Sequence, residues 1–324
     1  MMKKLSMLLC IAAAVCCAGC KSKKALLPTV SGKAGEVIVV MDKNNWEGAL
    51  GNETRELLAG DCPFLPWKEP MYSIVYVTPE GFADLFKVHR NIVMFQNNPQ
   101  GRNELQLLQD VWSRPQCVIN LCSTDPESAI ATLKDKSEVI LSAIEQAERD
   151  RVIINTMKYE VKDLHPIVKE VFGGAPHFPI GYVLKKKTDD FVWIADEKQT
   201  TMQGVLMYKY PVSGREEFTA SEIVRHRNEI LQTNVPGMFD GTYMTTSAAM
   251  EPQLSYVKYH GREFAQLRGL WEVQNDYMGG PFVSHSFYSA DGKDIIVLEA
   301  FVYAPKYDKR QYLRQTESIL YSWE

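Results

Sequence analysis

The sequence of 324 residues lacks the features that mark several large classes of protein. It has no block of basic residues and a formal net charge of −4, so it shows no nucleic-acid footprint. Its apolar N-terminal stretch, residues 5–18, is shorter than the roughly 20 residues that a membrane-spanning helix needs. No repeat with a period of about 20 to 50 residues is evident, which argues against solenoids and propellers. Hydrophobic residues make up 45% of the chain, and this content predicts a folded globular body.

The motifs of common hydrolases are also missing. The six histidines lie at least twelve residues apart, so no pair has the helical spacing of zinc hydrolases. No Gly-x-Ser-x-Gly sequence is present. Ser255-Tyr-Val-Lys258 matches Ser-x-x-Lys, but its usual companion motifs are absent and Ser255 falls in a strand pattern, so we interpret it as a chance match. We therefore predict no catalytic residue, no metal ligand and no cofactor.

The N-terminus carries a signal for export and lipid attachment. Lys3 and Lys4 precede the apolar stretch, which ends in Cys17-Ala-Gly-Cys20. Two small residues before a cysteine suit a lipoprotein signal peptidase, so this segment resembles the bacterial lipobox, although Cys17 stands where leucine is more usual. We predict a signal peptide over residues 1–19 and a Cys20 that carries diacylglycerol and an N-acyl chain such as palmitate. The alternative is an ordinary signal peptide that happens to contain cysteines.

This interpretation sets the location of the protein. Removal of residues 1–19 leaves 305 residues with a net charge of −6. Residues 20–34 have no apolar period and are typical of a lipidated, flexible tether. The acidic cluster that often marks surface-exposed lipoproteins of Bacteroidetes is missing, so we predict an outer-membrane lipoprotein that faces the periplasm. Its expected partners are the membrane, through the anchor, and an envelope protein or glycan, but no nucleic acid.

Three cysteines remain in the body of the protein: Cys62, Cys117 and Cys122. An odd number permits at most one disulfide in an oxidising compartment. Cys117 and Cys122 lie five residues apart in a predicted strand, so they face opposite sides about 16 Å apart and cannot pair with each other. A bond from Cys62 to one of them and buried free thiols both stay open. No Cys-x-x-Cys remains after the signal is removed, so thioredoxin-like chemistry and a structural zinc site are not indicated.

The first half of the mature chain, residues 35–160, alternates predicted strands and helices. Continuous apolar runs indicate strands at residues 36–41, 71–77, 91–96 and 116–121. Helices are predicted at residues 46–59, 79–89 and 105–112. A longer helix of nearly thirty residues is predicted to begin at Asp125-Pro126, where apolar residues follow the 3.6-residue period.

The second half, residues 161–324, is richer in aromatic residues and in predicted hairpins. Strands are predicted near residues 254–260, 262–275, 281–289 and 294–303. A capping box from Thr219 to Glu222 begins a helix that runs to about residue 232, and Asp308 with Gln311 opens a final amphipathic helix. Together the two halves predict an α+β fold with mixed or antiparallel sheets, flanking helices and two closely packed α/β halves.

Several short motifs are spread over nearly the whole mature chain. They are Gly35-Glu-Val-Ile-Val-Val-Met-Asp42 with Trp46, Leu65-Pro-Trp-Lys-Glu-Pro70, His89-Arg-Asn-Ile92, Val235-Pro-Gly237, Arg268-Gly-Leu-Trp271, Met278-Gly-Gly-Pro-Phe282 and Phe301-Val-Tyr-Ala-Pro-Lys306. Their order and spacing resemble a family of Bacteroidetes lipoproteins known only as domain of unknown function 4837. The resemblance implies an envelope lipoprotein, and it supplies no catalytic residue, substrate or cofactor.

Residues 268–285 hold the densest group of side chains suited to binding a ligand. Arg268 could hold a carboxylate or phosphate, and Trp271 or Tyr277 could stack on a sugar. Gly279-Gly280-Pro281 permits close backbone approach and positive φ, which suits a ligand cradle or a tight hairpin. The candidate ligand-binding residues are Arg268, Trp271, Asp276, Tyr277, Gly279, Gly280 and His285. The plainer alternative is a Gly-Gly-Pro turn between two strands with aromatic residues in the core.

These observations favour a binding or assembly module of the envelope over an enzyme. The alternative is a hydrolase of an envelope polymer or glycan that uses Arg268, Asp276 and His285. A deep cleft converging on His285, with a carboxylate of shifted pKa, would favour the hydrolase. A flat apolar patch of several hundred Å² would favour a partner surface.

Overall fold

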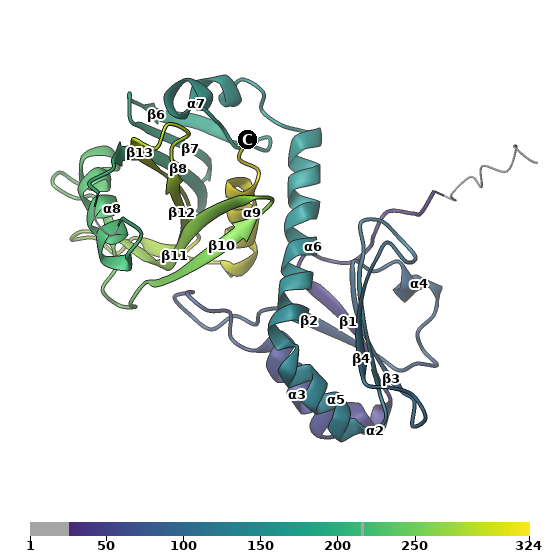
Figure 1. The fold of residues 1–324 in the computed structure, drawn as a ribbon. Coiled ribbons are helices and arrows are strands. Elements are labelled where there is room, and N and C mark those ends of the chain that lie inside the picture. The colour runs from purple at the N-terminus through teal and green to yellow at the C-terminus, as the bar shows by residue number, and fades with distance from the viewer. Residues whose placement is uncertain (1–25, 215–216) are drawn as a thin grey trace, which may run out of the picture.

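The computed structural model describes residues 26–214 and 217–324. The chain forms two α/β halves, each with its own sheet, and helix α6 (Ser137–Lys158) runs between them (Figure 1). The predicted α+β fold with mixed and antiparallel sheets and two packed halves is confirmed. The predicted signal peptide and Cys20 lie outside the described residues.

The first half is built on a five-stranded sheet in the order β2-β1-β3-β5-β4. Its four parallel strands are β2 (Ser73–Val77), β1 (Glu36–Val40), β3 (Asn91–Asn97) and β5 (Cys117–Ser123). Strand β4 (Glu104–Gln109) pairs antiparallel with β5 at the sheet edge. Residues 37–40 of β1 are buried on both faces, which explains the continuous apolar run in the sequence.

Helices cover both faces of this sheet. One face packs against α3 (Ala49–Ala59), α5 (Pro126–Asp135) and α6. The other face meets the residues around the short helix α4 (Asp84–Lys87). Asp125 caps α5, since its carboxylate accepts a hydrogen bond of 2.7 Å from the Ser128 backbone N–H.

Several predicted elements of this half differ in the structure. Residues 105–112, predicted as a helix, contain most of edge strand β4. A short apolar run has no clear period of its own, so the pairing with β5 determines that this segment is a strand. The long helix is broken at Lys136 into α5 and α6. The helix predicted at 46–59 is interrupted at Gly48, with α2 (Lys43–Glu47) before it and α3 after it. Residues 79–83 form turns before α4, next to Gly81, a residue with low helix propensity.

The second half is built on an eight-stranded antiparallel sheet in the order β10-β11-β12-β13-β8-β7-β6, with β9 paired to β11. The strands are β6 (Val183–Lys187), β7 (Phe191–Lys198), β8 (Thr201–Pro211), β9 (Met244–Thr246), β10 (Gln253–Tyr259), β11 (Arg262–Val273), β12 (Gly279–Tyr288) and β13 (Asp294–Tyr303). The four strands predicted between residues 254 and 303 are therefore confirmed to within a few residues.

Three helices cover the two faces of this sheet. Helices α7 (Leu164–Phe172) and α9 (Arg310–Tyr321) pack on one face, and α8 (Ala220–Asn234) packs on the other. The predicted Thr219 cap is present, since its hydroxyl accepts a hydrogen bond from the Glu222 backbone N–H. A fully buried bidentate ion pair, Arg227 with Glu299 at 2.7 and 2.8 Å, joins α8 to β13.

The start of α9 differs from the prediction. Instead of Asp308, the carboxylate of Glu69 accepts hydrogen bonds from the backbone N–H groups of Lys309 and Arg310, at 2.7 and 2.8 Å. A carboxylate at a helix N-terminus satisfies free donors and complements the helix dipole. Glu69 belongs to the proline-rich segment of the first half, so this cap ties the two halves together.

The packing of α6 against α9 adds a second connection between the halves.

Cys62, Cys117 and Cys122 are free thiols, so the disulfide left open by the sequence is not formed. Among the described residues, no helix is long and apolar enough to cross a membrane.

Candidate functional site

The structure divides the seven candidate residues of the sequence among three places. Arg268 and His285 lie on the α9 face of the sheet and are linked through Gln266, whose Oε1 accepts from Arg268 Nε at 3.0 Å and whose Nε2 lies 3.1 Å from His285 Nε2. Asp276 and Tyr277 lie in the turn between β11 and β12, where Tyr277 is fully exposed. The hydrolase candidates Arg268, Asp276 and His285 therefore do not share one site.

Trp271, Gly279 and Gly280 form the third place. The two glycines begin strand β12 and neither has positive φ, so the expected Gly-Gly-Pro turn is wrong. A Cβ on Gly280 would lie 2.0 Å from the carbonyl oxygen of Val302, which also accepts a hydrogen bond from Trp271 Nε1 at 3.2 Å. Close strand packing, rather than a ligand cradle, requires the glycine at position 280.

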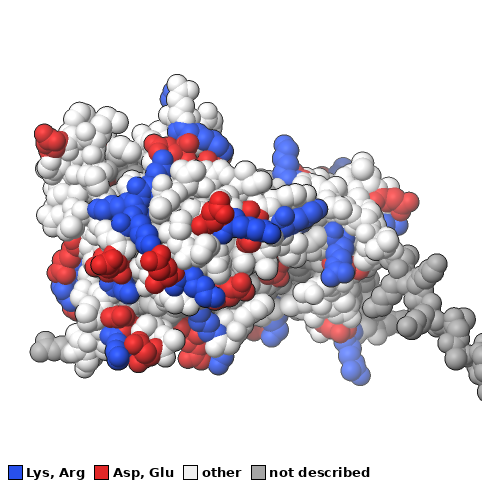
Figure 2. All heavy atoms as spheres, turned by 90° about the horizontal axis from the view of Figure 1, so that it is seen from above, with Lys and Arg blue, Asp and Glu red and all other residues white. Residues whose placement is uncertain are grey.

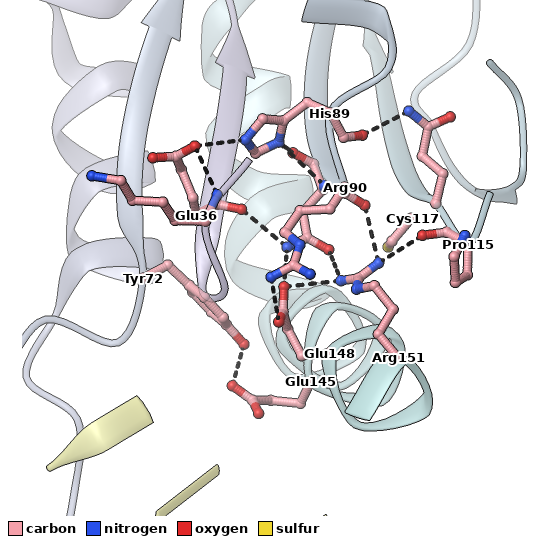
Figure 3. A network of polar contacts seen from close by, with 12 residues as sticks. Glu36, Tyr72, His89, Arg90, Pro115, Cys117, Glu145, Glu148 and Arg151 are labelled. Atoms are coloured by element: carbon pink, nitrogen blue, oxygen red, sulfur yellow. Dashed lines mark hydrogen bonds and ion pairs between the residues drawn. The ribbon is translucent and has the colours of Figure 1, made fainter. Parts of the chain in front are cut away.

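A buried polar network lies where the parallel strands of the first half begin (Figure 3). Glu148 of α6 is its centre, and its Oε1 accepts hydrogen bonds from Asn91 Nδ2 at 2.6 Å and Arg151 Nη2 at 2.9 Å. Arg151 also donates to the backbone carbonyls of Arg90 and Pro115, at 3.2 and 3.0 Å. We call this the amino-edge network; it fixes α6 against the strand starts, as a structural ion pair does.

One helical turn away on α6, Glu145 faces a different environment. A pocket of 460 Å³ lies there between the two halves, bordered by α6, α9 and β11. Its charged lining consists of four arginines, two glutamates and Lys258. We call it the arginine pocket and define it by Glu145, Arg149, Arg268, Arg310, Arg314 and Glu317.

Two of these arginines are paired with the two glutamates. Arg314 donates to Glu145 from Nε at 3.0 Å and from Nη2 at 2.5 Å, and the Tyr72 hydroxyl donates to the same carboxylate at 2.5 Å. Arg268 is paired with Glu317. The defining residues therefore leave two positive charges unbalanced.

Arg149 and Arg310 carry this excess. The Arg149 guanidinium lies 3.6 Å from the ring centroid of Tyr321 and donates to Gln146 Oε1 at 3.1 Å. Arg310 donates to the carbonyl of Pro70, and its buried Nε has no hydrogen-bond partner among the described residues. Neither forms an ion pair with a described carboxylate. Guanidinium groups in such a position suit a carboxylate or phosphate of a ligand.

Burial and neighbouring charges shift the pKa values of groups in and beside the pocket. Burial raises the pKa of the Cys62 thiol to about 11, so the thiol is protonated near neutral pH. His285 contacts the pocket residue Gln266 but does not itself line the pocket. It is fully buried, and burial, together with the nearby Arg262 and Arg268, holds its pKa well below the usual range. Burial acts to raise the pKa of Glu145, but Arg314 and the Tyr72 hydroxyl outweigh it, and the pKa lies below its usual value. These three groups thus lack the pKa near neutrality that general acid–base catalysis favours.

A second interdomain pocket, of 640 Å³, borders the amino-edge network. Its basic groups are largely engaged: Arg90 and Arg151 contact Glu148, and Lys198 pairs with Asp196 at 3.1 Å.

The described residues form no cluster of three or more His, Cys, Asp or Glu side chains able to hold a metal ion. On the face shown in Figure 2, Lys and Arg are interspersed with Asp and Glu.

Sequence reasoning found Arg268 but missed the rest of the arginine pocket. Glu145 and Arg149 lie four residues apart on α6, as do Arg310 and Arg314 on α9, a spacing that places each pair on one helix face. Such pairs usually indicate a solvated surface. Only the packing of α6 on α9, which brings Arg314 to Glu145 across 169 residues of chain, places these pairs around one pocket.

The fold is that of a two-part α+β protein, with a mostly parallel sheet followed by an antiparallel one. Residues 161–322, half of the chain, match the model of the family described as domain of unknown function (DUF4837). The chain belongs to this family. Residues 30–157 match a further family, described as domain of unknown function (DUF8532).

Similar solved structures are distant. One is a crystal structure from Bacteroides thetaiotaomicron VPI-5482, with 10% identity over 47% of this chain and 44% of that chain, and a TM-score of 0.26. This chain therefore spans less than half of that protein. Another is the human StarD13 (DLC2) lipid transfer and protein localization domain, with 12% identity over 43% of this chain and 89% of that chain, and a TM-score of 0.22. Both TM-scores lie below 0.5, so neither likeness shows a shared fold. No curated protein matches the chain.

Proposed function

We propose that the protein is a binding module of the cell envelope that holds a small anionic ligand in the arginine pocket. The observation that carries this proposal is the excess of guanidinium groups over carboxylates, with Arg149 resting on Tyr321 and making no ion pair with a described residue. A ligand carboxylate or phosphate would balance this charge, and charge-assisted hydrogen bonds to it are the strong kind. Tyr259 lines the same pocket, is partly exposed and suits a ring or apolar part of the ligand.

The location is part of the proposal. The lipobox ending at Cys20 supports a lipid anchor, and the absence of an acidic cluster after it supports the periplasmic side of the outer membrane. Labelled fatty acid should be incorporated by the normal chain and not by Cys20→Ala, which should accumulate as a precursor with the signal peptide attached. Continued labelling of Cys20→Ala would refute the anchor without affecting the ligand proposal.

Ligand binding is tested by calorimetric titration of the full chain, purified in detergent, with inorganic phosphate and with phenyl phosphate. We expect both to bind, phenyl phosphate more tightly, with an affinity that falls as the salt concentration rises. Arg149→Gln should weaken binding by about tenfold or more, because a charged hydrogen-bond donor is lost.

The matched control is Arg102→Gln, which removes the same charge from an exposed loop of the first half. It should bind both probes as the normal chain does. Failure of both probes to bind, or an equal loss of affinity in Arg102→Gln and Arg149→Gln, would contradict the proposal.

A further inference from the structure

A third pocket lies on the opposite face of the large sheet from the arginine pocket. It has a volume of 430 Å³, and most of its lining side chains belong to the face that carries α8. We call it the hydroxyl groove and define it by the residues Phe218, Tyr256, Lys258, Glu263, Ala265, Ser286 and Tyr288. None of these residues was a candidate in the sequence, and the proposed anion site uses only one of them, Lys258, at its rim.

Strand register sets the shape of the groove. Tyr256, Ala265 and Ser286 lie side by side on β10, β11 and β12, so their side chains share one face. Ala265 and Ser286 are small and buried, and they form the floor. Tyr256 and Tyr288 stand at the sides and are 74% and 52% exposed, which leaves ring surface available to a ligand.

Phe218 holds the two tyrosines in place. Its backbone carbonyl accepts a hydrogen bond from the Tyr256 hydroxyl at 3.1 Å. Its ring meets the Tyr288 ring edge to face, with centroids 5.0 Å apart. The aromatic walls are therefore positioned before any ligand arrives, which lowers the entropy lost on binding.

The floor of the groove carries an unused polar group. Ser286 is fully buried, and its Oγ has no hydrogen-bond partner among the described residues. A purely apolar ligand would leave this hydroxyl unsatisfied, which is unfavourable in a buried site. A ligand with hydroxyl groups of its own would satisfy it.

The charge of the groove points to a neutral ligand. Lys258 and Glu263 are the charged residues of its lining, and they pair with each other at 2.9 Å on its exposed rim. They offer one set of donors and one set of acceptors without a net charge. This contrasts with the arginine pocket, where positive charge is in excess.

We infer that the hydroxyl groove binds a neutral saccharide. A sugar ring has an apolar face that suits the tyrosine rings and hydroxyl groups around its edge that suit Ser286 and the rim pair. The volume lies within the range of small-molecule sites and accommodates a sugar residue at the end of a chain.

The test is calorimetric titration of the full chain with three neutral probes: chitotriose, cellotriose and maltotriose. At least one should bind. Ser286→Ala should weaken that binding by about five- to tenfold through loss of one hydrogen bond. Tyr256→Ala should weaken it by about tenfold, and Tyr256→Phe, which keeps the ring, should retain most of the affinity.

The matched control is Ser284→Ala. Ser284 is equally buried, lies two residues earlier on the same strand face and also has an unpartnered hydroxyl, but it does not line the groove. It should bind like the normal chain. The inference is overturned if none of the three saccharides binds, if Ser284→Ala weakens binding as much as Ser286→Ala, or if laurate binds the groove and the saccharides do not.

Discussion

Two glutamates one turn apart on α6 lie in different surroundings, one in the amino-edge network and the other in the arginine pocket. Glu148 is buried in the amino-edge network, where Asn91, Arg90 and Arg151 surround it. Glu145 lies at the edge of the arginine pocket, with its side chain 32% exposed, and is held by Arg314 and Tyr72. Both are ion-paired, so pairing alone does not distinguish a scaffold from a site.

The partners of the arginines make the difference. Arg151 donates hydrogen bonds to Glu148, to Asn91 and to the backbone carbonyls of Arg90 and Pro115, which precede strands β3 and β5 of the same half. Within the part of the chain that the structure describes, Arg149 makes one hydrogen bond, to the nearby Gln146, and stacks on Tyr321 of the other half. A guanidinium engaged by backbone and carboxylate holds a fold, whereas one left facing a cavity is available to a ligand.

The largest expected effect is on the amino-edge network. Glu148→Ala leaves two arginines without their buried carboxylate, and breaking a buried ion pair in this way costs about 3–5 kcal/mol of unfolding free energy. Urea unfolding followed by circular dichroism measures the loss. Glu138→Ala is the control, because Glu138 is exposed on the same helix and should change stability by less than about 1 kcal/mol. Equal losses in the two variants would show that the network is not structural.

An intermediate effect is expected at Glu145 and it should depend on pH. Glu145→Gln replaces the charged carboxylate that accepts hydrogen bonds from Arg314 and Tyr72 with a neutral amide. This should lower the free energy of unfolding by about 1–3 kcal/mol near neutral pH. The folded-state pKa of Glu145 is below its ordinary value of 4.5, so the stabilisation is fully present above that pH. It is lost as pH falls through the folded-state pKa and Glu145 takes up a proton.

Unfolding titrations of the normal chain and of Glu145→Gln at pH 7, 4.5 and 3 measure this dependence. The difference between the two proteins should shrink at the lowest pH. A difference that stays constant from pH 7 to pH 3 would show that the charge of Glu145 contributes nothing to stability.

The fold was more accessible from the sequence than the site. Buried parallel strands such as β1 appear as continuous apolar runs, and the cap at Thr219 lies within its own helix segment. The wrong secondary-structure predictions fall where contacts between residues distant in the sequence determine the structure. Edge strand β4 depends on its register with β5, and the start of α9 depends on Glu69, some 240 residues away in the chain.

The candidate site shows the same limit more sharply. Arg268 was found because its neighbours along β11 and β12 are rich in functional residue types. Arg149 and Arg310 were not found, because a charged residue on an amphipathic helix has the same sequence pattern whether it faces solvent or a cavity. The sequence also grouped Asp276 and Tyr277 with Arg268, although the strand carries them to its exposed end.

The smallest change in stability is expected for Arg149→Gln, which tests the comparison most directly. Because Arg149 makes no ion pair with a described residue, the main loss is its stacking on Tyr321, about 0.5–1 kcal/mol. Addition of about 10 mM phenyl phosphate should raise the melting temperature of the normal chain, since a ligand that binds only the folded state stabilises it. The same addition should raise the melting temperature of Arg149→Gln by less, because the variant is expected to bind phenyl phosphate about tenfold more weakly. A loss of more than about 3 kcal/mol without ligand would place Arg149 among the structural arginines, beside Arg151, and remove the distinction between the pocket and the network.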